Sequence, residues 1–190
     1  MKNFQNFDIL QIMKDKKIYI ILSQTGTMFS RALKFFTGAE YNHASISLSP
    51  TLDKMYSFGR LNPYNPFVGG FVQEGRNIGT FKRFSNTQAL VLEIGVTAEQ
   101  YAKIEFLIEY LSSHHRQFKY NYLGVLCACF KKNHEAKHRF YCSQFVRACL
   151  IYLGIENAES LPKIIKPIDF LRLTDKTILY QGALARYFVI

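Results

Sequence analysis

One cysteine of this chain has the local setting that nucleophilic catalysis needs. Cys142 opens the segment Cys142–Leu153, in which apolar residues recur at helical spacing until Gly154 ends the run. A thiol in the first turn of a helix lies near unpaired backbone N–H groups and the positive end of the helix dipole. Both favour the thiolate, which is the nucleophilic form. We therefore expect Cys142 to be able to attack a carbonyl carbon.

One histidine is a suitable base for that cysteine. His43 stands near the start of the segment Asn42–Leu48, where polar and apolar residues alternate as in a half-buried strand. It shares a face with Ser45 and Ser47, so we expect the imidazole at a polar edge that lines a cleft. There it could accept the thiol proton and later protonate a leaving group. Taken alone, Cys142 could be a packed core thiol, since free cysteine is among the most buried residue types, and His43 could be a structural histidine. The two residues are also 142 − 43 = 99 positions apart, so the sequence alone does not show that they meet.

Strands and helices are expected to alternate around these two residues. Residues 1–190 predict a single α+β domain with a mainly antiparallel sheet, and Asn62–Gly70 is predicted as a turn-rich loop. The expected strands are Lys17–Thr25, Asn42–Leu48, Met55–Phe58, Phe71–Glu74, Ala89–Glu93 and Ile178–Tyr180. The expected helices are Thr27–Phe36, one capped by Thr97 and Gln100, one within Arg116–Lys132, and Cys142–Leu153.

The chain is strongly basic, with 24 Lys and Arg against 14 Asp and Glu, a formal net charge of +10. Such a charge favours anionic partners, including an anionic membrane surface. No nucleic-acid recognition motif accompanies it, so specific nucleic-acid binding is not expected. No apolar run is long enough for a signal peptide or a spanning helix, which favours a cytoplasmic location with reduced cysteines. Cys127 and Cys129 are expected as small buried apolar residues, and no metal or organic cofactor is expected.

Four segments in chain order resemble the circularly permuted branch of the NlpC-type papain-like hydrolases, the YiiX-like group. They are KIYIILSQTGTMFSRALKFFTGAEYNHASISL, MYSFGR, FYCSQFVRACL and KPIDFLRL. The resemblance implies a permuted papain-like fold, in which the nucleophile helix docks on the sheet and the His strand precedes it in the chain. It also implies that Cys142 is the nucleophile and His43 the base.

The resemblance also suggests supporting residues. The third polar residue of the family, which orients the imidazole, falls at or near Ser57 here, although the family more often has His, Glu, Asp or Asn at that position. Glu74 and Tyr56 are alternative orienting residues. Tyr120, in the segment YNYLG, resembles a tyrosine that supports the oxyanion, although it could equally be a packing residue.

The expected function is thus a cysteine hydrolase that cleaves an amide or ester bond of a peptide or lipid substrate through an acyl-thioester on Cys142. Two alternatives stay open. The same fold could serve as a lipid acyltransferase or phospholipase, which the basic, aromatic-rich composition slightly favours. It could also be a non-catalytic binding module with an inert Cys142, which the serine at position 57 favours, since serine cannot stabilise an imidazolium by charge.

Overall fold

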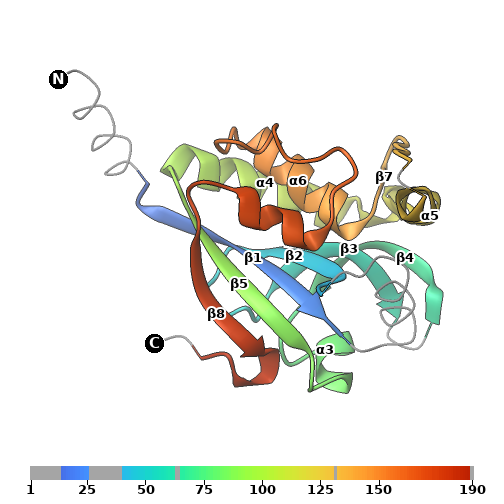
Figure 1. The fold of residues 1–190 in the computed structure, drawn as a ribbon, viewed down its shortest axis with the longest axis horizontal. Coiled ribbons are helices and arrows are strands. Elements are labelled where there is room, and N and C mark those ends of the chain that lie inside the picture. The colour runs from blue at the N-terminus through green and yellow to red at the C-terminus, as the bar shows by residue number, and fades with distance from the viewer. Residues whose placement is uncertain (1–13, 26–39, 63–64, 131, 189–190) are drawn as a thin grey trace.

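The computed structural model describes residues 14–25, 40–62, 65–130 and 132–188. Its strands form one eight-stranded sheet in the order β7-β6-β4-β3-β2-β1-β5-β8 (Figure 1). The strands are β1 Lys16–Gln24, β2 His43–Ser47, β3 Met55–Asn62, β4 Asn65–Glu74, β5 Gln88–Val96, β6 Lys119–Tyr120, β7 Arg139–Phe140 and β8 Thr177–Ala183. The α-helices are α3 Gly79–Arg83, α4 Ala98–Ser113, α5 Tyr122–Cys129 and α6 Cys142–Tyr152, and the 3₁₀ helices are η1 His115–Gln117, η2 Pro167–Arg172 and η3 Leu184–Arg186.

The predicted α+β class with a mainly antiparallel sheet is confirmed. Every strand pair is antiparallel except β6 and β7, which run parallel at one edge. The longest pairings join β1 to β5 and β3 to β4, and they surround the short strand β2. β2 is therefore a central strand, and the residue at its start, His43, pairs with Ser23 of β1.

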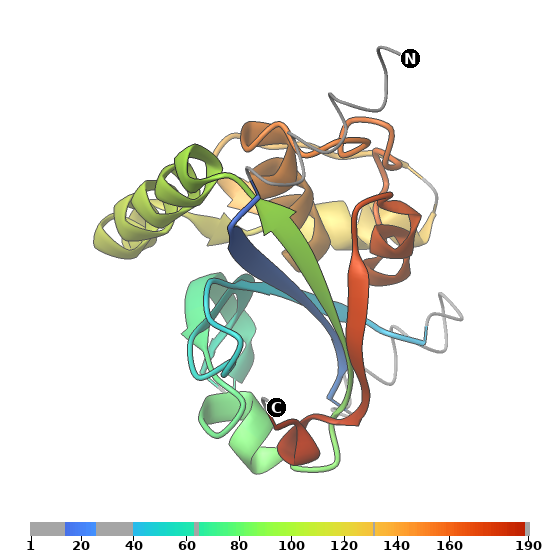
Figure 2. The same ribbon diagram turned by 90° about the vertical axis from the view of Figure 1, so that its left-hand side faces the viewer.

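Both faces of the sheet are buried. One face packs under α4, α6 and η2, with Ile20, Ile46 and Phe58 in that core. Figure 2 shows the sheet curling so that its other face turns toward α3 and the C-terminal 3₁₀ helix. This second face holds a smaller apolar cluster that includes Ile21, Met55 and Phe81. The two clusters alternate along each strand, as the two-residue period of a strand requires.

The helix α6 begins at Cys142, as predicted, and docks on the central strands. Phe145 packs against Phe58 and Phe71, with ring centroids 5.3 and 5.8 Å apart respectively. The helix ends before Gly154, whose φ of +66° is a conformation that glycine adopts without strain. Apolar packing thus fixes the body of α6 on the sheet (Figure 1), and its first residue, Cys142, lies near the start of β2.

Three predicted elements differ in the structure. The strand β2 is not half-buried, because Ser45 and Ser47 are fully buried on its second face. The segment Asn62–Gly70 is not a loop: β3 and β4 extend through it, apart from residues 63–64, as paired strands. The helix expected within Arg116–Lys132 is shorter, because η1 and β6 precede α5.

Other predicted elements agree with the structure. The strands at 17–25, 89–93 and 178–180 correspond to β1, β5 and β8. Thr97 and Gln100 form the expected capping box at the start of α4, with Gln100 N–H donating to Thr97 Oγ1 at 3.2 Å. The predicted helix Thr27–Phe36 lies outside the described residues. Within the described ranges, no helix combines the length and the apolar character that crossing a membrane requires.

Candidate active site

His43 and Glu74 form a largely buried pair at the ends of β2 and β4, the two strands on either side of β3. His43 is the first residue of β2 and Glu74 is the last residue of β4. The imidazole Nε2 lies 3.0 Å from Glu74 Oε2 and 3.1 Å from Oε1. Only 16% of the His43 side chain and 13% of the Glu74 side chain are exposed, so solvent screens this pair weakly.

Two buried serines hold the Glu74 carboxylate. Ser45 Oγ donates to Glu74 Oε2 at 2.8 Å, and Ser57 Oγ donates to the same oxygen at 2.9 Å. Both serines lie on the sheet face that carries His43, in strands next to each other in the sheet. Their hydroxyl groups stabilise the ionised carboxylate, which keeps a negative charge beside the imidazole.

The structure thus corrects the expected role of Ser57. Its hydroxyl contacts the carboxylate, and it is the carboxylate that contacts His43. Glu74, one of the two alternative orienting residues, occupies the orienting position. Glutamate can stabilise an imidazolium by charge, which serine cannot.

Cys142, the first residue of α6, lies close to His43, the first residue of β2. Each of the two side chains shifts the pKa of the other, through its charge and through hydrogen bonding, so they are close neighbours. Since Nε2 of the imidazole faces Glu74, Nδ1 is the nitrogen available to the thiol. The Cys142 sulfur also lies 4.0 Å from the Asn42 carbonyl oxygen, at the end of β2. The residues separated by 99 positions are therefore joined in one chain of contacts, from sulfur to imidazole to carboxylate.

Electrostatics in this chain favour the charged forms. Burial by itself raises the pKa of Cys142, but the hydrogen bond and the positive charge of His43 outweigh it and hold that pKa below its usual range. Burial likewise lowers the pKa of His43, but the negative charge of Glu74 and the contacts with Cys142 raise it to about 10. The arrangement supports a thiolate–imidazolium pair at neutral pH.

A second cysteine in α6, Cys149, shows how the pKa of a buried thiol in this helix shifts when His43 is not its neighbour. Cys149 is 1% exposed and packs in the main core. Burial raises its pKa above the usual range for a thiol. Position at the start of the helix and contact with His43, rather than burial, therefore distinguish the Cys142 thiol.

Tyr120 is close enough to Cys142 for their charges to interact. It is 8% exposed, and burial followed by the charge of Cys142 raises its pKa well above the usual range. Its hydroxyl therefore keeps its proton and can donate a hydrogen bond to a developing negative charge. The backbone N–H groups in the first turn of α6 are further donors.

Tyr56 has a packing role. It faces the core under α6, where its ring stacks on Phe71 at 6.2 Å between centroids. Its strand partner is Ile46, on the face opposite to that of Ser45 and His43. Because neighbouring residues of a strand point to opposite faces, Tyr56 and Ser57 cannot both face the imidazole. Tyr56 therefore packs on the face of the sheet opposite to the imidazole of His43.

An asparagine that the sequence analysis did not single out fastens the start of α6. Asn121 is 1% exposed, and its Nδ2 donates to Gln144 Oε1 at 3.2 Å and to the His134 carbonyl at 3.0 Å. Gln144 Oε1 also accepts the Tyr141 N–H at 3.2 Å. These bonds join the turn after Tyr120 to the residue before Cys142. The only sequence signal for this role of Asn121 was an asparagine within the YNYLG turn.

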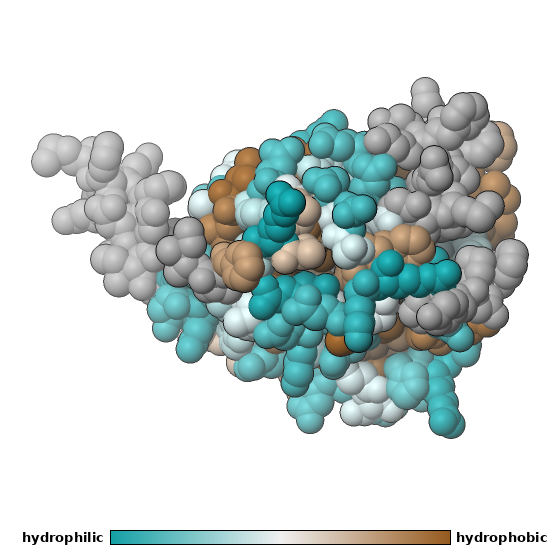
Figure 3. Space-filling model, turned by 90° about the horizontal axis from the view of Figure 1, so that it is seen from below, coloured by the Kyte–Doolittle hydropathy of each residue, from teal (hydrophilic) through white to brown (hydrophobic). Residues whose placement is uncertain are grey.

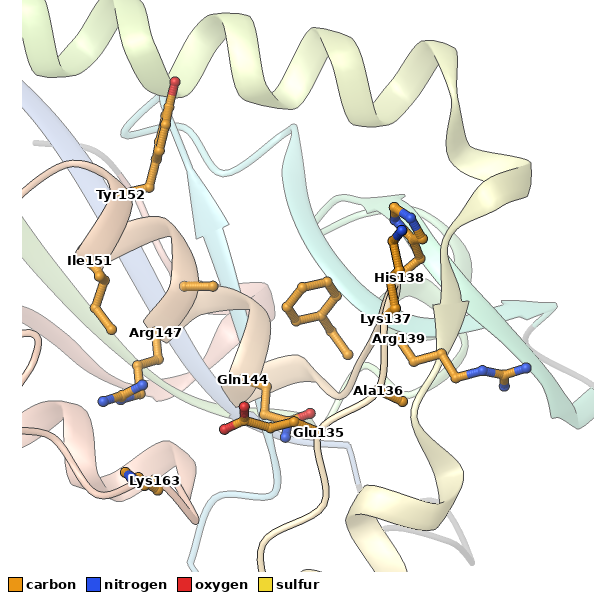
Figure 4. A pocket seen from close by; sticks show the side chains of 12 residues that line it. Glu135, Ala136, Lys137, His138, Arg139, Gln144, Arg147, Ile151, Tyr152 and Lys163 are labelled. Atoms are coloured by element: carbon orange, nitrogen blue, oxygen red, sulfur yellow. The ribbon is translucent and has the colours of Figure 1, made fainter.

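A separate hollow of about 610 Å³ lies on the outer side of α6. Figure 4 shows Arg147 and Lys163 at one end and Lys137, His138 and Arg139 at the other. Neither Cys142 nor His43 lines it, so it is separate from that pair. In the described part of the chain, no group of three or more His, Cys, Asp and Glu side chains is placed to hold a metal ion.

The comparisons with known proteins add no assignment to this geometry. Neither the family models nor the curated proteins contain a match to the chain.

Proposed function

We propose that the protein is a thiol-dependent hydrolase that cleaves an amide or ester bond, with Cys142 as nucleophile and His43 as general base and acid. The observation that carries the proposal is that the Cys142 sulfur lies 4.0 Å from the carbonyl oxygen of Asn42, the residue before His43, while His43 Nε2 lies 3.0 Å from Glu74 Oε2. A nucleophile, a base and a residue that orients the base are the parts that such chemistry needs.

Each step follows from the position of these groups. The Cys142 thiolate attacks the substrate carbonyl carbon, and the negative oxygen that forms is stabilised by N–H groups at the start of α6 and by the Tyr120 hydroxyl. The imidazolium of His43 then gives its proton to the departing amine or alcohol, which leaves an acyl-thioester. Neutral His43 next takes a proton from water, the resulting hydroxide attacks the thioester, and Cys142 is released. Glu74 keeps the imidazole oriented throughout.

We propose that the fold is a permuted papain-like one. The support is the packing of α6 on β2 and β3, together with a His strand that precedes the Cys helix in the chain. The serine at position 57 was the reason to consider a non-catalytic binding module. Glu74 supplies the charged orienting group that serine lacks, so that reason no longer favours the alternative.

Selective alkylation of Cys142 tests whether the thiol is activated. We expect iodoacetamide at pH 7 to modify Cys142 at least about tenfold faster in the wild type than in His43→Ala, because an ordinary thiol with a pKa of about 8.5 is only a few per cent thiolate there. Peptide mass spectrometry resolves the sites, and Cys149 serves as the internal control that labels only on unfolding. Equal labelling of Cys142 in both proteins would mean that His43 does not activate it.

The pH dependence of Cys142 labelling tests the direction of the two pKa shifts. Because the Cys142 pKa is lowered, labelling should continue at pH values below the ordinary thiol range. Because the His43 pKa is raised to about 10, the ion pair should persist until alkaline pH. His43→Ala should instead shift the Cys142 titration upward, because burial then raises the thiol pKa without the opposing charge of His43. Incubation with thioester, phospholipid and peptide panels, followed by intact-mass measurement, then identifies the acyl group that Cys142 accepts.

A further inference from the structure

One end of the molecule exposes a concentrated set of large apolar side chains. They come from α5 and its C-cap, and from the paired strands β3 and β4. The exposed fractions are Leu61 48%, Val68 48%, Tyr122 38%, Leu123 54%, Leu126 56% and Phe130 71%. We call these six residues the α5 surface. Brown atoms appear at the right-hand edge of Figure 3, the end at which Figure 1 draws α5 and β4, whereas most of the face in Figure 3 is hydrophilic.

Close contacts join the two parts of this surface. A Cβ built at Gly69 of β4 would come within 2.8 Å of both Tyr120 Cβ and Tyr122 Oη, so the start of α5 lies directly on the strand. Leu61 lies beside Gly70, which pairs with Lys119. The α5 surface therefore continues from the hairpin to the helix, and it adjoins Tyr120.

The helix itself lacks the polar face that a solvent-exposed helix normally has. The eight residues of α5, YLGVLCAC, include no charged residue. A surface helix of a globular protein usually turns charged or polar residues to water. Leu123 and Leu126 instead face solvent, which indicates that the helix is covered by an apolar partner in its working state.

Charge identifies the partner. Residues 119–139 contain five Lys and Arg residues and one acidic residue, Glu135. Lys119 and Lys132 are exposed immediately before and after α5, and Lys137 and Arg139 are exposed beyond it. Apolar side chains flanked by lysine and arginine fit a membrane interface, where the apolar groups enter the acyl region and the cations contact anionic headgroups.

We propose that the α5 surface docks the protein on an anionic lipid bilayer. Docking would bring the Tyr120 side of the molecule to the membrane, so the proposed acyl chemistry would act on an ester or amide held at that surface. The orientation of the substrate rests on the proposed function. The membrane contact itself does not.

Sedimentation with vesicles tests the contact. We expect the wild type to bind vesicles of phosphatidylglycerol and phosphatidylcholine at low salt and to bind pure phosphatidylcholine more weakly. The double substitution Leu126→Glu/Phe130→Glu should weaken binding about tenfold or more, because it places charge in the apolar contact. Phe106→Glu is the matched control: Phe106 is 67% exposed on α4, away from the α5 surface, and its substitution should leave binding unchanged.

The lysines give an independent variant that does not alter the apolar residues. Lys119→Gln/Lys132→Gln should reduce binding to anionic vesicles several-fold and reduce its salt dependence, with Lys103→Gln on α4 as control. Circular dichroism and Cys142 labelling show whether each variant is folded.

Three outcomes would overturn the membrane assignment: no vesicle binding by the folded wild type, equal loss in Phe106→Glu, or a concentration-dependent dimer that the Leu126/Phe130 variant abolishes without any vesicle binding. The last result would assign the surface to a second copy of the chain. Binding by a Cys142→Ser variant separates the two proposals, since docking should survive the loss of the nucleophile.

Discussion

At the scale of single residues, the site depends on how three ionisable groups share charge in a place that solvent screens weakly. Glu74 carries the negative charge, two serine hydroxyls and His43 stabilise it, and contact with these neighbours lowers its pKa although burial opposes the shift. The charge of Glu74 in turn favours the imidazolium, and the imidazolium favours the thiolate. Each member is expected to lose its perturbed pKa when its neighbour is removed.

Replacing the carboxylate with an amide tests this dependence. Glu74→Gln keeps the size of the side chain but removes the charge, so the His43 pKa should fall and Cys142 labelling at pH 6–7 should decrease. On the reaction itself we expect a loss of about 10²–10⁴-fold in kcat, the range for losing an aligned base. Ser57→Ala removes one of several bonds to the carboxylate and should cost far less. Equal effects of the two substitutions would argue that Ser57 has the larger role.

At the scale of elements, the first turn of α6 is held from two sides. Apolar packing of Phe145 fixes the helix on β3 and β4, and the amide of Asn121 fixes the turn that carries Tyr120 to Gln144 in the first turn. Packing alone would allow small shifts along the sheet, because apolar contacts have little directional preference. Hydrogen bonds from a buried amide are directional, so they determine where Cys142 lies relative to His43.

Removal of that amide should therefore affect stability and reactivity together. Asn121→Ala leaves the partners of a buried side chain unsatisfied, and we expect about 1–3 kcal/mol of destabilisation with slower Cys142 labelling. Asn133→Ala is the control, since Asn133 is exposed and its side-chain amide donates to the exposed Glu135, and it should change stability by less than about 0.5 kcal/mol. Urea unfolding followed by circular dichroism measures the stability of both variants, and iodoacetamide labelling measures the reactivity of Cys142. A stability loss without any change in labelling would separate Asn121 from the site.

At the scale of the whole molecule, the buried pair makes stability depend on pH. His43 has its pKa raised, so its stabilising contribution is complete below the unfolded value of about 6.5 and is lost as pH rises through about 10. Glu74 has its pKa lowered, so its contribution is complete above its unfolded value of about 4.3 and is lost as pH falls through the folded value. Both contributions are complete between about pH 4.3 and 6.5.

A comparison of two variants isolates this pair. In a Cys142→Ala background, which removes the thiol, adding His43→Ala leaves Glu74 buried without its charged partner. We expect a cost of about 3–5 kcal/mol near pH 6, which shrinks as pH rises and does so at lower pH than with the thiol present, because the contribution of Cys142 to the raised His43 pKa is gone. Urea midpoints at several pH values measure the difference. A cost that stays constant from pH 6 to 10 would mean that His43 is neutral in the folded protein.

Local chemistry determined much of this molecule from the sequence. The periodic apolar residues of α6, the capping box at Thr97 and the apolar run of β1 predict their elements, because these signals act within a few residues along the chain. The choice of Cys142 and His43 as the reactive pair also came from local patterns and a family resemblance, and its catalytic role stays a prediction.

Tertiary structure decided the rest. The partner of His43 is Glu74, 31 positions away, and only the pairing of β2, β3 and β4 brings the carboxylate to Nε2 and the two serines to the carboxylate. The same pairing makes strands of most of Asn62–Gly70, where the local pattern indicated a loop. It also buries Ser45, where the local pattern indicated a polar edge that lines a cleft. Contacts between distant segments set these outcomes, and neither periodicity nor residue type along the chain encodes which segments will meet.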